Sequence, residues 1–379
     1  MTVRRNCNLP DAPGPILVGG FTFAPQEGKH NDAHSLPDGR MTAPAVQLVD
    51  YPSGDTYLTV NLRIEPGTSA TQALTDRFTL VDKLINGKFP HGGKVVNRQV
   101  VSKTEVPLGA DFQKLVAQAV DEIRNGTFEM VVTARELQVR LGEDFDLLTA
   151  VESLRSSSLG ATVFAAHTRN EGLKQCFLGA TPEYLVRLKG DTVQTLGLAG
   201  STPRGLDPEE DYALERELLA NEKLRHENAV VTEMLSRALS DVCHRIEVAK
   251  EPTVLKLTNI QHLATHLSGQ LASSPPLGIL DLVAKLHPTP ALGGYPRHAA
   301  LNWLGQNEPI NRGWFASPVG WVDGHGTGEF AVAIRSALVQ GELASLYAGC
   351  AIVEGSEPDA EYEETSIKLR TMASALGCL

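Results

Sequence analysis

Two strand-like segments joined by a short turn dominate the C-terminal third of the sequence. Residues 328–339 and 343–353 are rich in Val, Ile, Leu and Ala, and Gln340-Gly-Glu342 supplies the turn between them. A helical pattern follows, from about Pro358 to Leu376. Hairpins of this kind, interleaved with helices, are typical of an α+β fold with antiparallel sheets surrounded by helices.

Similar signals upstream predict the rest of this fold. Apolar residues at helical spacing predict a helix over 111–124, and Asp207-Pro208 begins a second helix that runs, with a break, to about residue 243. Strands are predicted at 16–23, 45–49, 56–64, 129–135, 161–166, 176–180 and 184–188, the last two as a hairpin.

The chain shows no composition break that would separate independent halves. Residues 24–44, rich in Gly, His, Asp and Pro, predict a loop. No Pro/Gly/Ser linker occurs elsewhere, so we expect one fold: a strand-rich N-terminal portion over 1–110, packed on a catalytic portion over 111–379.

Composition excludes several classes of function. With 379 residues, 42% of them hydrophobic, the chain can bury a large core. A net charge of −11 argues against nucleic acid or an anionic membrane as partner, and a small anionic substrate would need a local cluster of cations. Five cysteines without a Cys-x-x-Cys pair, and no apolar N-terminal run, predict a cytoplasmic protein. A monomer or a dimer is expected.

The predicted C-terminal helix carries charged groups on one face. Glu361, Glu364 and Lys368 are three and four residues apart, and the same face continues to Met372 and Leu376. A charged face that becomes apolar points partly inward. A solvated Glu364/Lys368 pair is the alternative.

A further carboxylate is expected to be buried. Glu227 lies one turn before a stripe that begins at Val230 and Val231. Buried carboxylates require a partner or a metal, and oxygen ligands without His or Cys favour Mg²⁺. A paired structural carboxylate remains the alternative.

The strand over 328–339 places Arg335 on a face of small residues. Period-two alternation groups Arg335 with Ala331, Ala333 and Ala337, which suits a cavity where the guanidinium binds a carboxylate. An Arg on a half-exposed face is the alternative. Gly349 and Gly200 are candidate positions for close approach of a ligand to the backbone, or they serve turns only.

Together these segments resemble the chorismate-utilising enzymes, and among them the isochorismate synthases of menaquinone and siderophore biosynthesis. The resemblance covers roughly residues 110–379, in the family's order. It is carried by Gly179-Ala-Thr-Pro-Glu183, Leu198-Ala-Gly-Ser201, Glu222-Lys-Leu-Arg-His-Glu227, His262-Leu-Ala-Thr265, Leu286-His-Pro-Thr-Pro-Ala-Leu-Gly-Gly294, Ala333-Ile-Arg335, Tyr347-Ala-Gly-Cys-Ala-Ile-Val353 and Glu361-Tyr-Glu-Glu-Thr-Ser-Ile-Lys368.

The resemblance implies an anthranilate synthase component I-like fold and a Mg²⁺-dependent isomerisation of chorismate, in which water enters the ring and the allylic hydroxyl leaves. It assigns Glu183 as the acid that protonates the departing hydroxyl. The implied metal ligands are Glu227 and Glu364, with Glu361 close by. The implied substrate contacts are Arg335, Lys368, Gly200, Gly349, His262 and Tyr347.

One position indicates the branch of the family. The resemblance places Ala291 where ammonia-using anthranilate and aminodeoxychorismate synthases, and also salicylate synthases, tend to have threonine. Ala291 therefore favours water as the nucleophile and makes the next step of salicylate synthesis, loss of pyruvate, the less favoured outcome.

Two positions depart from the family. Its strand usually reads Lys-Val-Val-Leu-(Ser/Ala)-Arg, with the lysine as the base that activates water, and here Met130 stands in that place. Glu129 points to the other face of a regular strand. The alternatives are a divergent base, a weakly active or non-catalytic chorismate-binding homologue, an engineered change, a shift in register or another branch of the family. Ala351 replaces a common glycine.

Overall fold

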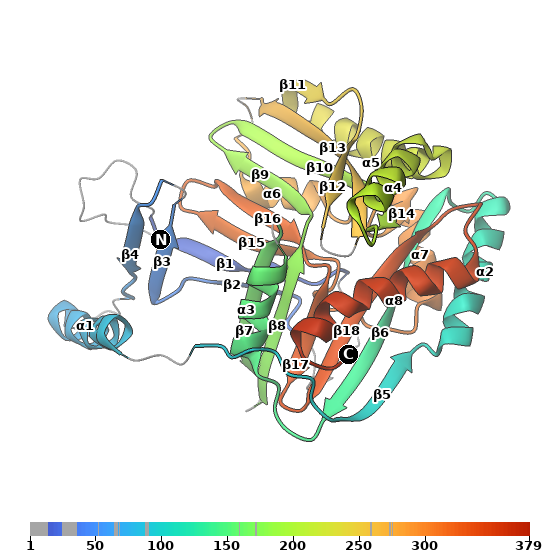
Figure 1. Cartoon of the computed structure of the whole chain (residues 1–379). Helices are drawn as coiled ribbons and strands as arrows, with labels where there is room; N and C mark the ends of the chain where they lie inside the picture. Colours follow the sequence, from blue (N-terminus) through green and yellow to red (C-terminus); the bar gives the residue numbers. More distant parts are fainter. Residues whose placement is uncertain are drawn as a thin grey trace.

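The structure is a computed structural model. It describes residues 14–379 except 25–35, 52, 64–66, 68, 88–90, 159, 171–172, 258–259, 273 and 275. Within this part of the chain, two large antiparallel sheets are surrounded by helices, as Figure 1 shows, so the predicted α+β fold is confirmed.

The sheets differ in size and order. One runs β11-β13-β10-β9-β16-β15-β1-β2, with β12 also paired to β13, and the other runs β14-β6-β18-β17-β8-β7, with β5 also paired to β6. The strands are β1 (Ile16–Phe21), β2 (Gly39–Thr42), β3 (Val46–Asp50), β4 (Thr56–Val60), β5 (Val100–Val106), β6 (Met130–Leu141), β7 (Thr162–Asn170), β8 (Leu173–Thr181), β9 (Tyr184–Lys189), β10 (Thr192–Pro203), β11 (Cys243–Val248), β12 (Thr253–Lys256), β13 (Ile260–Leu271), β14 (Gly294–Tyr295), β15 (Pro318–Asp323), β16 (Gly328–Val332), β17 (Ser336–Gln340) and β18 (Leu343–Ile352).

Helices cover the sheets. α5 packs on β10 and β13 of the larger sheet, and α8 lies across β18 of the smaller one, as Figure 1 shows. The helices are α1 (Ala70–Asn86), α2 (Gly109–Arg124), α3 (Leu147–Ser157), α4 (Pro208–Ala220), α5 (Glu222–Ser240), α6 (Ile279–Leu286), α7 (Arg297–Asn307) and α8 (Pro358–Ala375).

The chain passes between the two sheets at two adjacent points. β8 belongs to the smaller sheet and β9 to the larger, with Glu183 between them. β16 belongs to the larger sheet and β17 to the smaller, with Arg335 between them. The backbone joins these crossings, because Val332 N donates to Glu183 O (3.0 Å) and Ala180 N donates to Arg335 O (3.1 Å).

Two predictions about these segments are wrong for the same reason. The expected hairpin of 176–180 with 184–188 does not form, since β8 pairs with β7 and β17 while β9 pairs with β10 and β16. The expected continuous strand over 328–339 breaks where Arg335 adopts a φ of 49°. Period-two alternation cannot detect a strand that changes sheets.

The predicted hairpin between 328–339 and 343–353 survives in its second half. β17 pairs with β18 around Gly341, whose φ of 60° suits a tight turn. The helix over 111–124, the helix from Pro358 and the helix beginning at Asp207-Pro208 are also confirmed, the last broken at Asn221.

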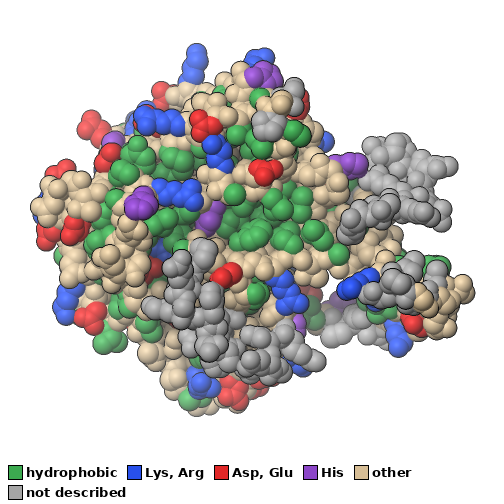
Figure 2. Space-filling model, turned by 180° about the vertical axis from the view of Figure 1, so that it is seen from behind, with side chains coloured by type: hydrophobic (Ala, Val, Ile, Leu, Met, Phe, Trp, Pro, Cys, Tyr) green, Lys and Arg blue, Asp and Glu red, His purple; other side chains and the backbone are tan. Residues whose placement is uncertain are grey.

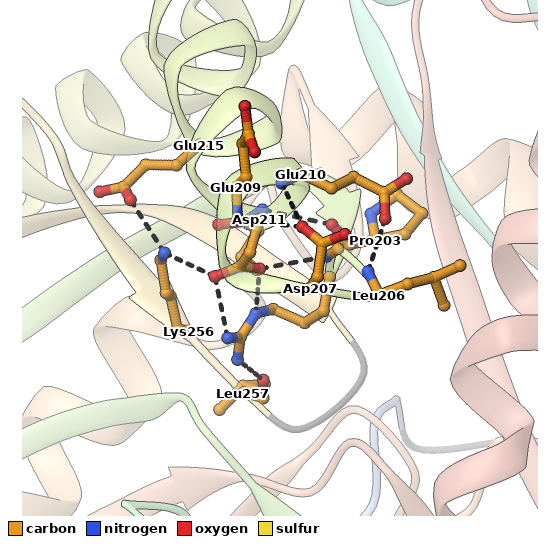
Figure 3. Close-up of polar contacts among 12 residues, drawn as sticks. Pro203, Leu206, Asp207, Glu209, Glu210, Asp211, Glu215, Lys256 and Leu257 are labelled. Carbon is orange, nitrogen blue, oxygen red and sulfur yellow. Dashed lines mark hydrogen bonds and ion pairs between the residues drawn. The ribbon is translucent and has the colours of Figure 1, made fainter.

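An ion-pair cluster fixes the start of α4. Asp207 caps the helix by accepting from Glu209 N (3.0 Å) and Glu210 N (2.9 Å). Just inside it, the Asp211 carboxylate contacts the Arg204 guanidinium and Lys256 Nζ (2.7 Å), as Figure 3 shows. Hydrogen bonds from Arg204 and Lys256 hold the pKa of Asp211 below its ordinary value. The cluster therefore ties α4 to the ends of β10 and β12.

The N-terminal residues contribute to more than one unit. β1 and β2 extend the larger sheet, so the loop predicted over 24–44 is wrong at 39–42; its residues 25–35 lie outside the described part. The hairpin of β3 and β4 is confirmed. α1, which the sequence analysis did not predict, lies with this hairpin at one side of the molecule in Figure 1.

The surface and helices were compared with the expected partners. Figure 2 shows Lys and Arg side chains interspersed with Asp and Glu around a central hydrophobic area, and the described part of that face carries no continuous basic stripe. Among the described helices, none combines the length and apolar character needed to cross a bilayer.

Candidate active site

A cavity lies where the two sheets meet, bounded by α5 and α8. Its lining contains eleven of the twelve site residues expected from the sequence: Met130, Glu183, Gly200, Glu227, His262, Ala291, Arg335, Gly349, Glu361, Glu364 and Lys368. They come from β6, β10, β13, β18, α5, α8 and the crossings between sheets. The fold thus gathers groups separated by more than 200 positions in sequence.

Glu183 is held rigidly at the first crossing. Its backbone N donates to Thr181 Oγ1 (3.2 Å) and its backbone O accepts from Val332 N (3.0 Å), while its side chain is buried. Burial raises the pKa of Glu183 to about 8, against the opposing charges of Arg335 and Lys368. This carboxyl group is therefore protonated near neutral pH and can donate a proton.

Arg335 and His262 form a buried pair beside Glu183. Arg335 Nη2 lies 3.5 Å from His262 Nε2, and His262 Nδ1 lies 2.8 Å from Ser201 Oγ. Burial lowers the pKa of His262, further lowered by Arg335 and Lys368, so the ring is neutral. Because a guanidinium only donates, Nε2 accepts and Nδ1–H donates to Ser201.

Arg335 keeps its charge in this environment. Burial lowers the pKa of its guanidinium to about 10, although Glu364 and Glu183 oppose the shift. The left-handed φ at a non-glycine residue is a strained conformation of the kind found at functional sites. Arg335 thus presents a fixed cation to an anionic ligand.

Three carboxylates from two helices line one side of the cavity. Glu227 projects from α5, and Glu361 and Glu364 project from α8. Burial raises the pKa of Glu227 to about 8, with Glu364 and Glu361 raising it further. Burial also raises the pKa of Glu361, as does Glu364.

Two lysines offset this negative charge. Lys223 Nζ lies 3.6 Å from Glu361 Oε1, and Lys368 Nζ lies 2.5 Å from Glu364 Oε1 while donating to Gly349 O (2.8 Å). The sequence analysis missed Lys223, although its position four residues before Glu227 places both on one face of α5.

The donor set fits a hard divalent cation. The three groups are carboxylates with mutual repulsion that a cation would relieve, and no His or Cys competes with them in the lining except His262 and Cys350. In the described part of the chain, no three His, Cys, Asp or Glu side chains already converge as a metal cage.

The α8 carboxylates are supported from behind by a buried arginine. Arg135, 1% exposed, donates to Thr365 Oγ1 (2.7 Å) and Ser366 Oγ (2.7 Å). Its guanidinium lies 4.3 Å from the centre of the Tyr362 ring. These contacts fix the orientation of α8 relative to β6.

The wall formed by Met130 is apolar. Met130 is 2% exposed and belongs to the hydrophobic core together with Ala291, Leu292, Phe315 and Ala316. Glu129 is exposed, as expected for the opposite face of the strand. The thioether of Met130 carries no proton-accepting group of useful basicity.

Two glycines allow the backbone to lie close to the cavity. Gly200 has a φ of 78°, and a Cβ there would lie 2.9 Å from Leu224 O. A Cβ at Gly349 would lie 2.9 Å from Thr133 O. The space required by these positions explains glycine at both, apart from any ligand contact. Ala351 also lines the cavity.

Tyr347 does not line the cavity as expected. Its ring stacks on Phe315, with centroids 5.4 Å apart, and Phe315 faces the cavity in its place. Burial raises the pKa of the Tyr347 phenol. Arg312 and Phe315, which were not predicted, lie in an irregular segment where periodicity gives no signal.

Comparison with known proteins agrees with this arrangement. The family model described as "Chorismate binding enzyme" matches residues 2–377. The isochorismate synthase MenF of Bacillus subtilis is 38% identical over 366 residues, which cover 97% of this chain and 75% of that one.

Solved structures show the same fold. The menaquinone-specific isochorismate synthase MenF of Escherichia coli has a TM-score of 0.82 at 25% identity, covering 95% of this chain and 78% of that one. Anthranilate synthase component I of Streptococcus pneumoniae has a TM-score of 0.80 at 21% identity, covering 98% and 82%, and this likeness concerns the fold alone. The chain therefore belongs to the chorismate-binding enzyme family, where it is similar to the isochorismate synthases.

Proposed function

We propose that the protein is an isochorismate synthase, which converts chorismate into isochorismate by adding water to the ring and releasing the allylic hydroxyl. The observation that carries this proposal is the joint placement, in one cavity, of a protonated buried acid, three carboxylates and a set of cations. Similarity to isochorismate synthases over almost the whole chain supports it.

In this mechanism, Arg335 and Lys368 hold the carboxylates of chorismate. A protein of net charge −11 needs such local cations to bind an anionic substrate. Glu183 donates its proton to the departing hydroxyl, which leaves as water, and His262 keeps Arg335 oriented through the contact at 3.5 Å.

Glu227 and Glu364, with Glu361, would hold Mg²⁺. The ion would neutralise these carboxylates and polarise the bound substrate. Water enters from the wall that contains Met130, where the family has its base. We propose residues 111–379 as the catalytic portion, since the cavity lining falls between Met130 and Lys368.

A second candidate function is chorismate binding without efficient turnover. Met130 favours it, because the apolar wall around this residue offers no side chain that could activate water. Both candidates predict binding of chorismate, and only the first predicts a product.

Incubation of purified protein with chorismate and Mg²⁺, followed by chromatographic separation of products, tests the proposal. Isochorismate that disappears when Mg²⁺ is removed with a chelator supports it. Anthranilate formed with ammonium, or salicylate with pyruvate, would move the protein to another branch. Calorimetric binding of chorismate with no product would establish the second candidate.

The pH dependence follows from Glu183. Its carboxyl group must be protonated to act as the acid, and its pKa is raised to about 8 by burial. We expect kcat/KM to fall as pH rises through about 8, measured by initial rates in buffers of constant ionic strength. A rate that keeps rising above this pH would remove Glu183 from the role of acid.

Removal of Lys223 should strengthen cation binding. Lys223 lies 3.6 Å from Glu361, so its ammonium opposes a divalent ion at the same carboxylates. Lys223→Met is expected to bind Mg²⁺ about ten-fold more tightly, equivalent to about 1.4 kcal/mol. Calorimetry of the protein without substrate measures this, with the exposed Lys114→Met as control. Weaker binding would show that Lys223 instead supports the ligands.

A further inference from the structure

A buried ion pair lies directly behind the Met130 wall. Arg312 and Glu308 have side chains 4% and 5% exposed, and Arg312 donates to both carboxylate oxygens, Nε to Oε1 (2.6 Å) and Nη2 to Oε2 (2.7 Å). The Arg312 guanidinium also lies 4.2 Å from the centre of the Phe23 ring. The pair is therefore rigid and shielded from water.

The pair replaces backbone partners that β6 lacks. β14 pairs with β6 only at Met130 and Val131. Beyond this point, Arg312 Nη2 donates to Val132 O (2.5 Å), and Glu308 Oε2 accepts from Ala134 N (2.9 Å). The two side chains thus continue the edge of the sheet where the neighbouring strand ends.

The same pair holds the turn that contains Ala291. Arg312 Nη1 donates to Leu292 O (2.8 Å), and Val132 N donates to Gly293 O (3.3 Å). Val132 and Leu292 both line the cavity, and Arg312 contributes to the lining itself. One guanidinium therefore fixes the distance between two parts of the same wall, the β6 edge and the turn.

We infer that Glu308 and Arg312 are a positioning pair for the reaction, which fixes the wall formed by Met130, Val132 and Ala291 where the nucleophile enters. This inference rests on the proposed function. A buried ion pair is often no more stabilising than an apolar replacement, so stability alone gives little reason for one at this place. A displacement of the wall by about 1 Å can lower a rate about 10²-fold.

The chain contains a matched control pair. Arg204 donates to both oxygens of Asp211, Nε to Oδ1 (2.5 Å) and Nη2 to Oδ2 (2.9 Å), and Nη1 donates to the Leu257 carbonyl (2.5 Å). Figure 3 shows this cluster. It repeats the chemistry of the Glu308–Arg312 pair, a two-point ion pair plus a backbone carbonyl, but neither residue lines the cavity.

The test compares Arg312→Lys with Arg204→Lys, each made in the wild type and in a Met130→Lys background. For Arg312→Lys we expect kcat to fall about 10- to 100-fold with KM for chorismate unchanged, because Arg335 and Lys368 still hold the substrate. The amide of Ala134 should exchange hydrogen faster. Arg204→Lys should change neither kcat nor the exchange at Ala134.

Each other outcome counts against the inference. Equal loss of kcat in both variants would show a general effect of stability, and unchanged exchange at Ala134 would show that Arg312 does not hold β6. If neither background forms isochorismate while chorismate still binds, the proposed function fails. Exchange at Ala134 then decides separately whether the pair positions the wall.

Discussion

Met130→Lys is expected to increase the rate of isochorismate formation about 10²- to 10⁴-fold, the usual contribution of a positioned base. Lysine and methionine have unbranched chains of similar length, and Met130 already faces the cavity from the first position of β6. A new amino group there would be desolvated by Ala291, Leu292 and Phe315, which lowers its pKa and favours the neutral form that accepts a proton from water.

The control for this gain is Met130→Leu, which keeps the wall apolar and should leave the rate unchanged. Product formation is followed by chromatography, and chorismate affinity by calorimetry, in all three proteins. A Met130→Lys protein that binds chorismate without any gain in rate would contradict the assigned role of this position. Ala351→Gly would then be the next variant, since Ala351 also lines the cavity.

Much of the candidate site could be predicted because its residues lie on regular helices. Glu361, Glu364 and Lys368 follow helical spacing, and the inward face they share with Met372 is the one that α8 turns toward the sheet. Glu227 is buried one turn before an apolar stripe, as its position predicted. Local periodicity is sufficient where one element supplies several groups.

Prediction failed where function depends on how the sheets join. Arg335 was placed on a strand face, but it lies at the crossing between sheets, with a φ that no periodic pattern indicates. Tyr347 was expected in the cavity and stacks behind Phe315. Arg312 gave no signal because its partners, Val132 and Leu292, are distant in sequence.

The assignment of catalytic roles, the Mg²⁺ ligands, the division at residue 110, the oligomeric state and the cytoplasmic location stay predictions. The family and fold rest on firmer ground, since the family model and the solved structures cover nearly all of the chain. Variants of single cavity residues are therefore the experiments that separate a shared fold from a working site.

Glu183→Gln is expected to reduce isochorismate formation about 10²- to 10⁴-fold in the Met130→Lys background, because the amide cannot donate a proton as the carboxyl group does. Gln has nearly the same shape, so Arg335 and Lys368 should still bind chorismate, and calorimetry checks this. The fall in rate above pH 8, expected from the raised pKa of Glu183, should vanish with the carboxyl group.

Stability provides an independent test of the same substitution. The folded-state pKa of Glu183 is raised from 4.5 to about 8 by burial, so the stability it contributes is full below pH 4.5 and is lost as pH rises through about 8. Glu183→Gln should remove this dependence, leaving the variant more stable than its parent at pH 9 in urea unfolding. If the variant lost activity yet kept the parent's pH dependence of stability, the buried proton would belong to another group. Glu183 would then matter for packing and not for proton transfer.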